Sequence, residues 1–192
     1  MRKCGLASLA FFYHDFREAQ KKDLRGLLSS VLIQLCDQSD PYHYILSDFY
    51  SAHYNNGEHR SSNDALVRCL KTVLQVPGQA PVFLIIDALD ECPDTSAMPS
   101  PRAKVLMFMK DLIDLHLPNL RICLTSRPEP DIRAVLEPLT FRFISLHDEV
   151  GQREDIKDYI KSVVHTNRKM RRWSPELKQL VIDDLTKRAE GS

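Results

Sequence analysis

The sequence predicts an α/β fold in which a parallel sheet of about four strands is flanked by helices. Short apolar segments with strand character alternate with segments whose apolar residues recur at helical spacing. Two of the strand segments lead at once into polar or charged residues, Asp87 in one case and Ser126-Arg127 in the other. The chain has 192 residues, of which 43% are hydrophobic, so it is long enough to bury a sizeable core. Strands that alternate with helices run parallel, and we expect helices on both faces of the sheet.

The first half of the chain is predicted to hold a strand over residues 9–13. Three helices follow it, one over residues 24–36, one that begins at residue 40 and one that begins at residue 64. The strand is short and rich in aromatic residues. The first helix has a wide apolar face at helical spacing. Asp40-Pro41 begins the second helix, since Asp is a good cap and Pro suits the first turn. Pro77-Gly78 ends the third helix.

The second half is predicted to hold three strands, over residues 82–86, 121–125 and 141–146. It is also predicted to hold two helices, over residues 102–116 and 131–136. Pro118-Asn119 ends the longer helix, and Pro128-Glu129-Pro130 forces a turn. We expect Asp131 to cap the short helix that follows this turn.

The composition changes after His147. A charged helix over residues 153–164 and another that opens at Ser174-Pro175-Glu176 follow, with no further strand segment. The sequence therefore predicts an α/β domain over residues 1–150 and the beginning of a helical appendage over residues 151–192.

The bulk composition excludes several classes of protein. Lys plus Arg and Asp plus Glu both number 26, so the net charge of zero argues against general affinity for nucleic acid or membrane lipid. The run from Lys169 to Trp173 could contact either ligand, but a solvated linker with the Trp packed down is the favoured interpretation. The five cysteines are widely spaced, which predicts buried, reduced thiols and a cytoplasmic protein.

Three carboxylates follow the strand over residues 82–86. Like charges at a strand end repel one another unless a cation lies among them, and Mg²⁺ with a nucleotide polyphosphate is the natural candidate. Asp87 is the candidate to hold Mg²⁺ through water, and Glu91 or Asp90 would orient and deprotonate an attacking water. The alternative interpretation is a strand that leads into an acid-rich loop or the start of a helix.

Polar residues follow the strand over residues 121–125 in the same way. Arg127 would neutralise charge on a transferring phosphoryl group, and Thr125 and Ser126 would sense the terminal phosphate. The alternative is that Arg127 is a surface cation or the partner of a nearby carboxylate, within an ordinary turn.

The element that should hold the phosphates is not among these residues. A phosphate loop has the form G-x-x-x-x-G-K-[ST], and none of the six glycines is followed by lysine. We therefore expect little or no hydrolysis by this chain. An interaction module that uses a degenerate nucleotide-binding fold, with protein partners or self-association, is the alternative function.

Four segments resemble a known family: LAFFYHDF, DLRGLLSSVLIQL, PVFLIIDALDEC and NLRICLTSRPEPDIRAVL. They are similar to the NACHT module of fungal STAND-class P-loop proteins, also described as the nephrocystin-3-like amino-terminal domain. The resemblance implies Mg-ATP as cofactor, with Asp87 on Mg²⁺, Glu91 and Asp90 on the attacking water, and Arg127 on the γ-phosphate. It also makes IIDALDE similar to the Walker B motif.

The resemblance begins after the family's first strand, phosphate loop and following helix. The chain is thus expected to be a truncated NACHT signalling domain, in which the missing strand would lie between those of Cys123 and Ile144.

Overall fold

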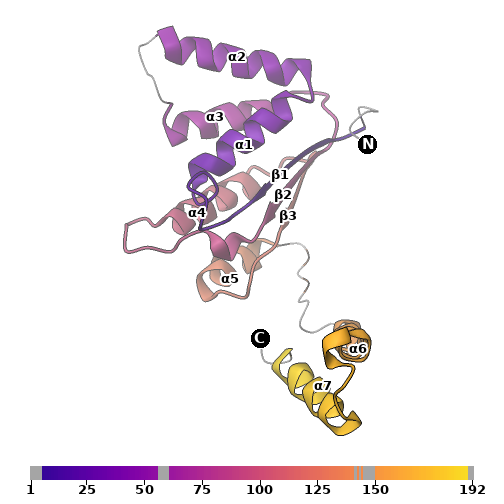
Figure 1. Cartoon of the computed structure of the whole chain (residues 1–192). Coiled ribbons are helices and arrows are strands. Elements are labelled where there is room, and N and C mark those ends of the chain that lie inside the picture. The colour runs from indigo at the N-terminus through magenta and orange to yellow at the C-terminus, as the bar shows by residue number, and fades with distance from the viewer. Residues whose placement is uncertain (1–5, 56–60, 141, 143, 145–149, 190–192) are drawn as a thin grey trace. The chain divides into compact units, whose positions relative to one another are not determined.

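A computed structural model describes residues 6–55, 61–140, 142, 144 and 150–189 (Figure 1). The chain divides into two compact units, Met1–Thr140 and Phe141–Ser192, which are described separately. In the part of the chain that the structure describes, no helix is both long and apolar enough to cross a membrane.

A three-stranded parallel sheet forms the centre of the first unit. Its strands are β1 (Ser8–Tyr13), β2 (Val82–Asp87) and β3 (Leu120–Leu124), in the spatial order β1-β2-β3. The register pairs Tyr13 with Asp87 and Ile86 with Leu124. The predicted parallel α/β sheet is confirmed with three strands. The strand predicted over residues 141–146 falls mainly outside the described residues, and Arg142 and Ile144 are not in a strand.

Among the described residues of this unit, five helices accompany the sheet: α1 (Leu24–Cys36), α2 (Asp40–Asn55), α3 (Asn63–Leu74), α4 (Pro101–Ile113) and α5 (Pro130–Leu136). Short 3₁₀ segments follow β2 and α5, η2 (Leu89–Glu91) and η3 (Glu137–Leu139). Asp23 caps α1, because its carboxylate accepts a hydrogen bond from the Gly26 N–H at 2.9 Å. The predicted cap of α5 is wrong: Pro130 already occupies the first turn, so Glu129 takes the cap position and makes no side-chain cap bond.

The core lies between one face of the sheet and the helices. α1 packs on β1, with α2 and α3 behind it, and α4 packs between α1 and α5. Leu27, Leu28 and Leu35 of α1 are fully buried. Truncating any one of them to Ala would cost about 2–5 kcal/mol of stability, since it leaves a cavity as well as removing apolar contact. The predicted apolar faces of the helices thus account for the core.

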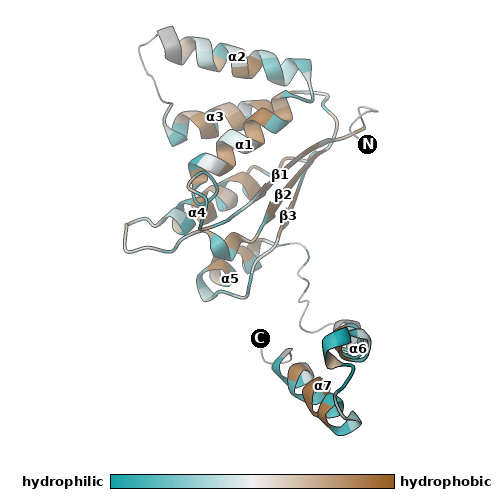
Figure 2. Ribbon diagram, in the orientation of Figure 1, coloured by the Kyte–Doolittle hydropathy of each residue, from teal (hydrophilic) through white to brown (hydrophobic). Residues whose placement is uncertain are grey.

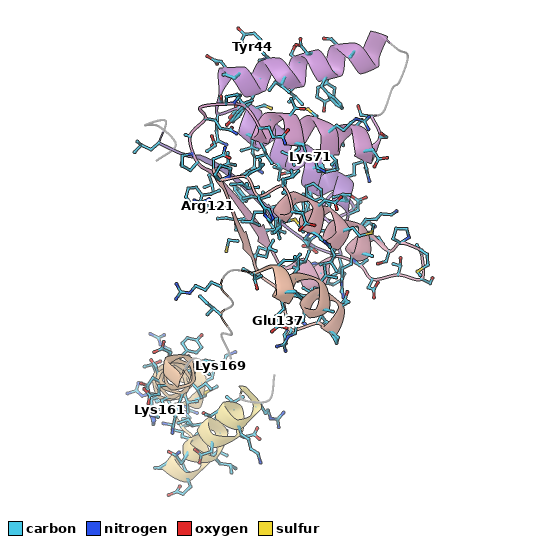
Figure 3. All side chains as sticks on the ribbon, turned by 180° about the vertical axis from the view of Figure 1, so that it is seen from behind. Tyr44, Lys71, Arg121, Glu137, Lys161 and Lys169 are labelled. Carbon is cyan, nitrogen blue, oxygen red and sulfur yellow. The ribbon has the colours of Figure 1, made fainter. Side chains whose placement is uncertain are left out.

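Within the described residues, helices cover only one face of the sheet. The side chains of β2 alternate strictly between buried and exposed. On the open face, Phe11 is 49% exposed, Phe83 41% and Ile85 37%. The expectation that both faces are covered is therefore wrong for this unit, even though its strands are largely hydrophobic (Figure 2). Arg121 of β3, labelled in Figure 3, is exposed as well. The next residue on the same face, Cys123, is also exposed.

The outer edge of β1 is closed by two glutamines, Gln34 of α1 and Gln38, which lies two residues beyond the end of that helix. The Gln38 side-chain amide accepts from the Leu9 N–H at 2.9 Å and donates to the Leu9 carbonyl at 2.8 Å. The Gln34 side-chain amide likewise accepts from the Phe11 N–H at 3.1 Å and donates to the Phe11 carbonyl at 2.7 Å. The two glutamines are four residues apart, at the last turn of α1 and just beyond it, and they reach backbone groups two residues apart along the strand edge. This edge therefore offers few free backbone groups to another strand.

Three of the cysteines are buried free thiols, Cys36, Cys69 and Cys92. Burial raises the pKa of Cys36 and Cys69 to about 11 and that of Cys92 to about 12. Cys123 is exposed, so the expectation of buried thiols is confirmed for three and wrong for this one. Cys4 lies outside the described residues.

The second unit is a pair of helices, α6 (Val150–Thr166) and α7 (Pro175–Ala189), with the short η5 (Arg168–Met170) between them. α6 and α7 pack against each other, and Val164 and Ile182 are buried. Trp173 is half-buried beside the exposed Arg171 and Arg172. The two helices predicted here are confirmed.

Candidate functional site

The carboxyl ends of the three parallel strands meet at one edge of the sheet. We call this edge the carboxyl rim and define it as residues 13–17, 87–91 and 125–127. Every candidate residue of the sequence analysis lies on it, because β2 ends at Asp87 and β3 ends immediately before Thr125. Parallel pairing thus places the acids of one loop beside the polar residues of the next.

Thr125 binds the end of β2 through both its side chain and its backbone. Its hydroxyl donates a hydrogen bond to the Asp87 carboxylate and accepts one from the Ala88 N–H at 3.1 Å. Its N–H donates to the Ile86 carbonyl at 3.0 Å, and its carbonyl accepts from the Leu89 N–H at 3.0 Å. These four bonds hold the loop after β2 against the loop after β3.

The chain turns sharply after Asp87. Ala88 adopts a left-handed conformation with φ 54° and ψ 48°, which costs about 1–2 kcal/mol for a residue with a Cβ. Leu89, fully buried in the core, anchors the 3₁₀ turn that follows. The turn carries Asp90 back towards β3, while Glu91 is half-exposed.

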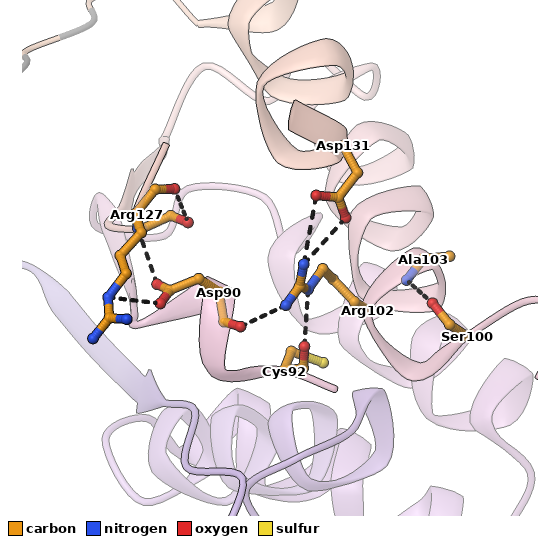
Figure 4. A network of polar contacts seen from close by, with 8 residues as sticks. Asp90, Cys92, Ser100, Arg102, Ala103, Arg127 and Asp131 are labelled. Atoms are coloured by element: carbon orange, nitrogen blue, oxygen red, sulfur yellow. Dashed lines mark hydrogen bonds and ion pairs between the residues drawn. The ribbon is translucent and has the colours of Figure 1, made fainter. Parts of the chain in front are cut away.

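Asp90 and Arg127 pair across the rim (Figure 4). One Asp90 carboxylate oxygen accepts from the Arg127 N–H at 3.0 Å, and the other lies 3.5 Å from the Arg127 Nε. The Asp90 side chain is 11% exposed, whereas that of Arg127 is 80% exposed. Arg127 therefore has donors left for an anion from solution. The Ser126 hydroxyl donates to the Arg127 carbonyl at 2.7 Å, so it is turned to its own loop.

The loop after β1 adds residues that the sequence analysis did not select. His14 is buried, and its backbone N–H donates to the Asp87 carbonyl at 3.0 Å. Among the described residues, neither imidazole nitrogen has a hydrogen-bond partner of ordinary geometry. Burial lowers the pKa of His14 from 6.5 to about 4, although the Lys21 backbone and the Asp23 and Asp90 charges offset part of this effect.

Asp15 and Arg17 form a two-pronged ion pair beside His14. Arg17 Nε donates to one Asp15 carboxylate oxygen and Arg17 Nη2 donates to the other, both at 2.9 Å. The Arg17 backbone N–H also donates, at 2.9 Å, to the oxygen that Nε binds. These bonds lower the pKa of Asp15 from 3.8 to about 2. The pair raises the pKa of Arg17, and the charge of Glu91 contributes to this. The sequence could have indicated these residues as part of the site, since His14 to Arg17 follow a predicted strand just as Asp87 does.

The donor set at the rim suits a water-bridged cation better than a closed metal site. Among the described residues there is no group of three or more His, Cys, Asp or Glu side chains that could hold a metal ion. Mg²⁺ on a nucleotide commonly takes only one or two carboxylates and fills its other positions with water and phosphate oxygens. Asp87, whose carboxylate accepts a hydrogen bond from Thr125, can supply one such carboxylate.

Two open hollows lie away from the rim. One, of about 310 Å³, is lined by Leu74–Gln79 and Leu117–Asn119, which precede β2 and β3 at the opposite edge of the sheet. The other, of about 480 Å³, lies where α1 leads into α2 and is lined mainly by polar residues. Neither contains a rim residue.

In a comparison with protein families, residues 2–127 match the model described as Nephrocystin 3, N-terminal. The match covers about two thirds of the chain, including β1 to β3, and ends at Arg127, the last residue of the rim. Comparisons with curated proteins and with solved structures gave no match. The chain therefore belongs to the nephrocystin 3 N-terminal domain family.

Proposed function

We propose that this chain is part of a NACHT-type signalling protein of the STAND class, and that its carboxyl rim faces the phosphates and Mg²⁺ of ATP. The observation that carries the proposal is the pair of contacts across neighbouring strand ends. Thr125 binds Asp87, and Arg127 binds Asp90. An acid at one strand end beside an arginine at the next suits a ligand that is an anion with its own cation.

The roles follow from the exposure and contacts of each residue. Asp87, at the end of β2, would hold Mg²⁺ through water, and Thr125 orients its carboxylate. Arg127 would reach the terminal phosphate, because most of its side chain is exposed. Both Asp90 oxygens are directed at Arg127, which leaves Glu91 as the better candidate to orient an attacking water.

We propose that the chain by itself binds Mg-ATP weakly and hydrolyses little of it. Backbone amides of a phosphate loop normally supply much of the phosphate-binding energy, and these 192 residues contain no such loop. Asp87, Asp90 and Glu91 would also repel a phosphate that is not neutralised.

Calorimetric titration with Mg-ATP tests this proposal. We expect a dissociation constant of about 1 mM, corresponding to about −4 kcal/mol, and a further loss in Asp87→Ala and Arg127→Ala. Asp114→Ala, at the end of α4 and away from the rim, is the matched control and should bind as wild type does. Micromolar affinity that Asp87→Ala abolishes would contradict weak binding. No heat at any usable concentration would contradict nucleotide recognition by this rim.

We propose self-association as a second candidate function, because the described residues leave the outer edge of β3 unpaired beside the open apolar face. Val82 N–H binds the Asn119 carbonyl and Thr125 N–H binds the Ile86 carbonyl, so Ile122 and Leu124 direct their N–H and C=O groups away from β2. No glutamine closes this edge among the described residues, in contrast to β1. Two such edges from identical chains can pair antiparallel about a twofold axis.

Sedimentation equilibrium over a range of concentrations tests this candidate. We expect a dimer that Cys123→Lys disrupts, since a lysine on an edge strand opposes pairing. Met107→Lys replaces another exposed apolar residue, on α4, and should leave the dimer intact. A wild-type monomer at every concentration would contradict self-association.

A further inference from the structure

Arg102, the second residue of α4, reaches from that helix to the turn after β2. Its Nη2 donates to the Asp90 carbonyl at 2.6 Å, and its Nε donates to the Cys92 carbonyl at 2.9 Å. Its Nη1 lies 3.5 Å from both carboxylate oxygens of Asp131 in α5 (Figure 4). One guanidinium therefore joins the turn, α4 and α5.

The chemistry of arginine is required at this position. The Arg102 side chain is only 12% exposed, so its charge must be met by nearby acceptors. Two carbonyls and one carboxylate meet it from different directions, which a planar group with five N–H donors can satisfy and a lysine ammonium cannot. The backbone of Arg102 is also fixed. Ser100 caps α4 through the Ala103 N–H at 3.1 Å, and the Arg102 N–H donates to the Pro93 carbonyl at 3.1 Å.

Both the backbone carbonyl and the side-chain carboxylate of Asp90 accept hydrogen bonds from arginines. Arg102 binds its backbone carbonyl, while its carboxylate binds Arg127. A shift of the turn would move the Asp90 carboxylate away from Arg127, because the turn contains only three residues. The contacts thus run without interruption from Asp131 through Arg102 and Asp90 to Arg127.

We propose that Arg102 is a positioning residue of the carboxyl rim. It fixes the turn after β2 so that Asp90 presents its carboxylate to Arg127, and through Asp131 it couples the position of α5 to that pair. Arg102 does not touch a ligand. The consequence for phosphate binding rests on the proposed function, whereas the positioning itself does not.

The amide resonance of Arg127 in the full chain reports the contact directly, since a carboxylate that accepts an N–H shifts its proton downfield. Asp90→Ala gives the position of this resonance when the contact is lost. We expect Arg102→Met to move it at least half of the way to that position, and Arg102→Lys to move it part of the way. Core amides of Leu27 and Leu28 should not shift in either variant.

Arg121→Met is the matched control. Arg121 also donates to two backbone carbonyls, those of Pro118 at 2.7 Å and Leu120 at 3.0 Å, but at the start of β3. It should leave the Arg127 resonance unchanged. A folded Arg102→Met whose Arg127 resonance stays at the wild-type position would overturn the proposal. If Arg102→Met does not fold, Arg102→Lys decides, and a wild-type resonance in that variant has the same meaning.

The nucleotide titration separates this inference from the proposed function. Where wild type binds Mg-ATP, we expect Arg102→Met to weaken binding in the same direction as Arg127→Ala. Where wild type shows no binding, the proposed function fails, and the Arg127 resonance still tests the positioning role.

Discussion

The hydroxyl of Thr125, just beyond β3, donates a hydrogen bond to the carboxylate of Asp87 at the end of β2. The same oxygen accepts the N–H of Ala88, so one side chain satisfies both the last residue of the strand and the first residue of the turn. Thr125→Val keeps the shape and removes both bonds. We expect it to cost about 1–2 kcal/mol of stability, because the Ala88 N–H loses its acceptor.

Urea denaturation of Thr125→Val beside Thr72→Val measures this cost. The Thr72 hydroxyl donates only to the Arg68 carbonyl within α3, so its loss should cost less than about 0.5 kcal/mol. Equal midpoints for the two variants would show that the contact between Thr125 and Asp87 contributes little.

The buried His14 predicts an acid-sensitive fold. The pKa of His14 is about 4 in the folded chain, below its ordinary value of 6.5, so the unfolded chain takes up a proton first as the pH falls. The stability that depends on neutral His14 is present above pH 6.5 and is lost between pH 6.5 and pH 4. The loss amounts to about 3 kcal/mol, since each unit of pKa difference corresponds to about 1.4 kcal/mol.

Denaturation midpoints measured from pH 7.5 to pH 4 check this dependence. We expect His14→Phe to flatten the profile in this range, while His43→Gln, at an exposed position on α2, leaves it unchanged. An unaltered slope in His14→Phe would assign the acid sensitivity to other groups.

The ion pair of Asp15 and Arg17 predicts a change in titration. Arg17→Met removes the two side-chain bonds to Asp15 and keeps the bond from the backbone N–H, so the pKa of Asp15 should rise from about 2 part of the way towards 3.8. Carbon NMR of the Asp15 carboxyl group through a pH titration measures it. Lys21 contributes less to the shift, so Lys21→Met is the control and should change the pKa of Asp15 less than Arg17→Met does.

The left-handed conformation of Ala88 predicts tolerance of glycine at that position. Ala88→Gly relieves the backbone strain but gives the unfolded chain more freedom, so we expect stability to stay level or rise by up to about 1 kcal/mol. Ala103→Gly, in the first turn of α4, should instead lose up to about 1 kcal/mol. Urea denaturation compares the two, and a loss at Ala88 as large as that at Ala103 would contradict the account.

The strands and helices of the first unit were largely predictable, because short apolar runs mark the strands and apolar residues three to four apart mark the buried faces of the helices. The open face was not. Phe11, Phe83 and Ile85 make β1 and β2 apolar on both sides, which is the pattern of strands covered by two layers of helices. A sequence does not distinguish an apolar residue that is covered from one that is left exposed.

The rim was predictable in its residues but not in its pairing. Asp87 and Arg127 were identified because each follows a strand, and parallel topology placed them on one edge. The contact between Asp90 and Arg127 depends on the left-handed turn at Ala88, and an alanine gives no sign of such a turn. The role of Arg102 depends on the approach of α4 to that turn, which no local pattern encodes.

The glutamines at β1 determine where this sheet can grow. Their side-chain amides stand in for the peptide groups of a neighbouring strand, so that side of the sheet is already occupied. Any additional strand, from whatever source, must join at β3. β3 would then become an interior strand, and a parallel newcomer would bring its carboxyl end directly beside Arg127.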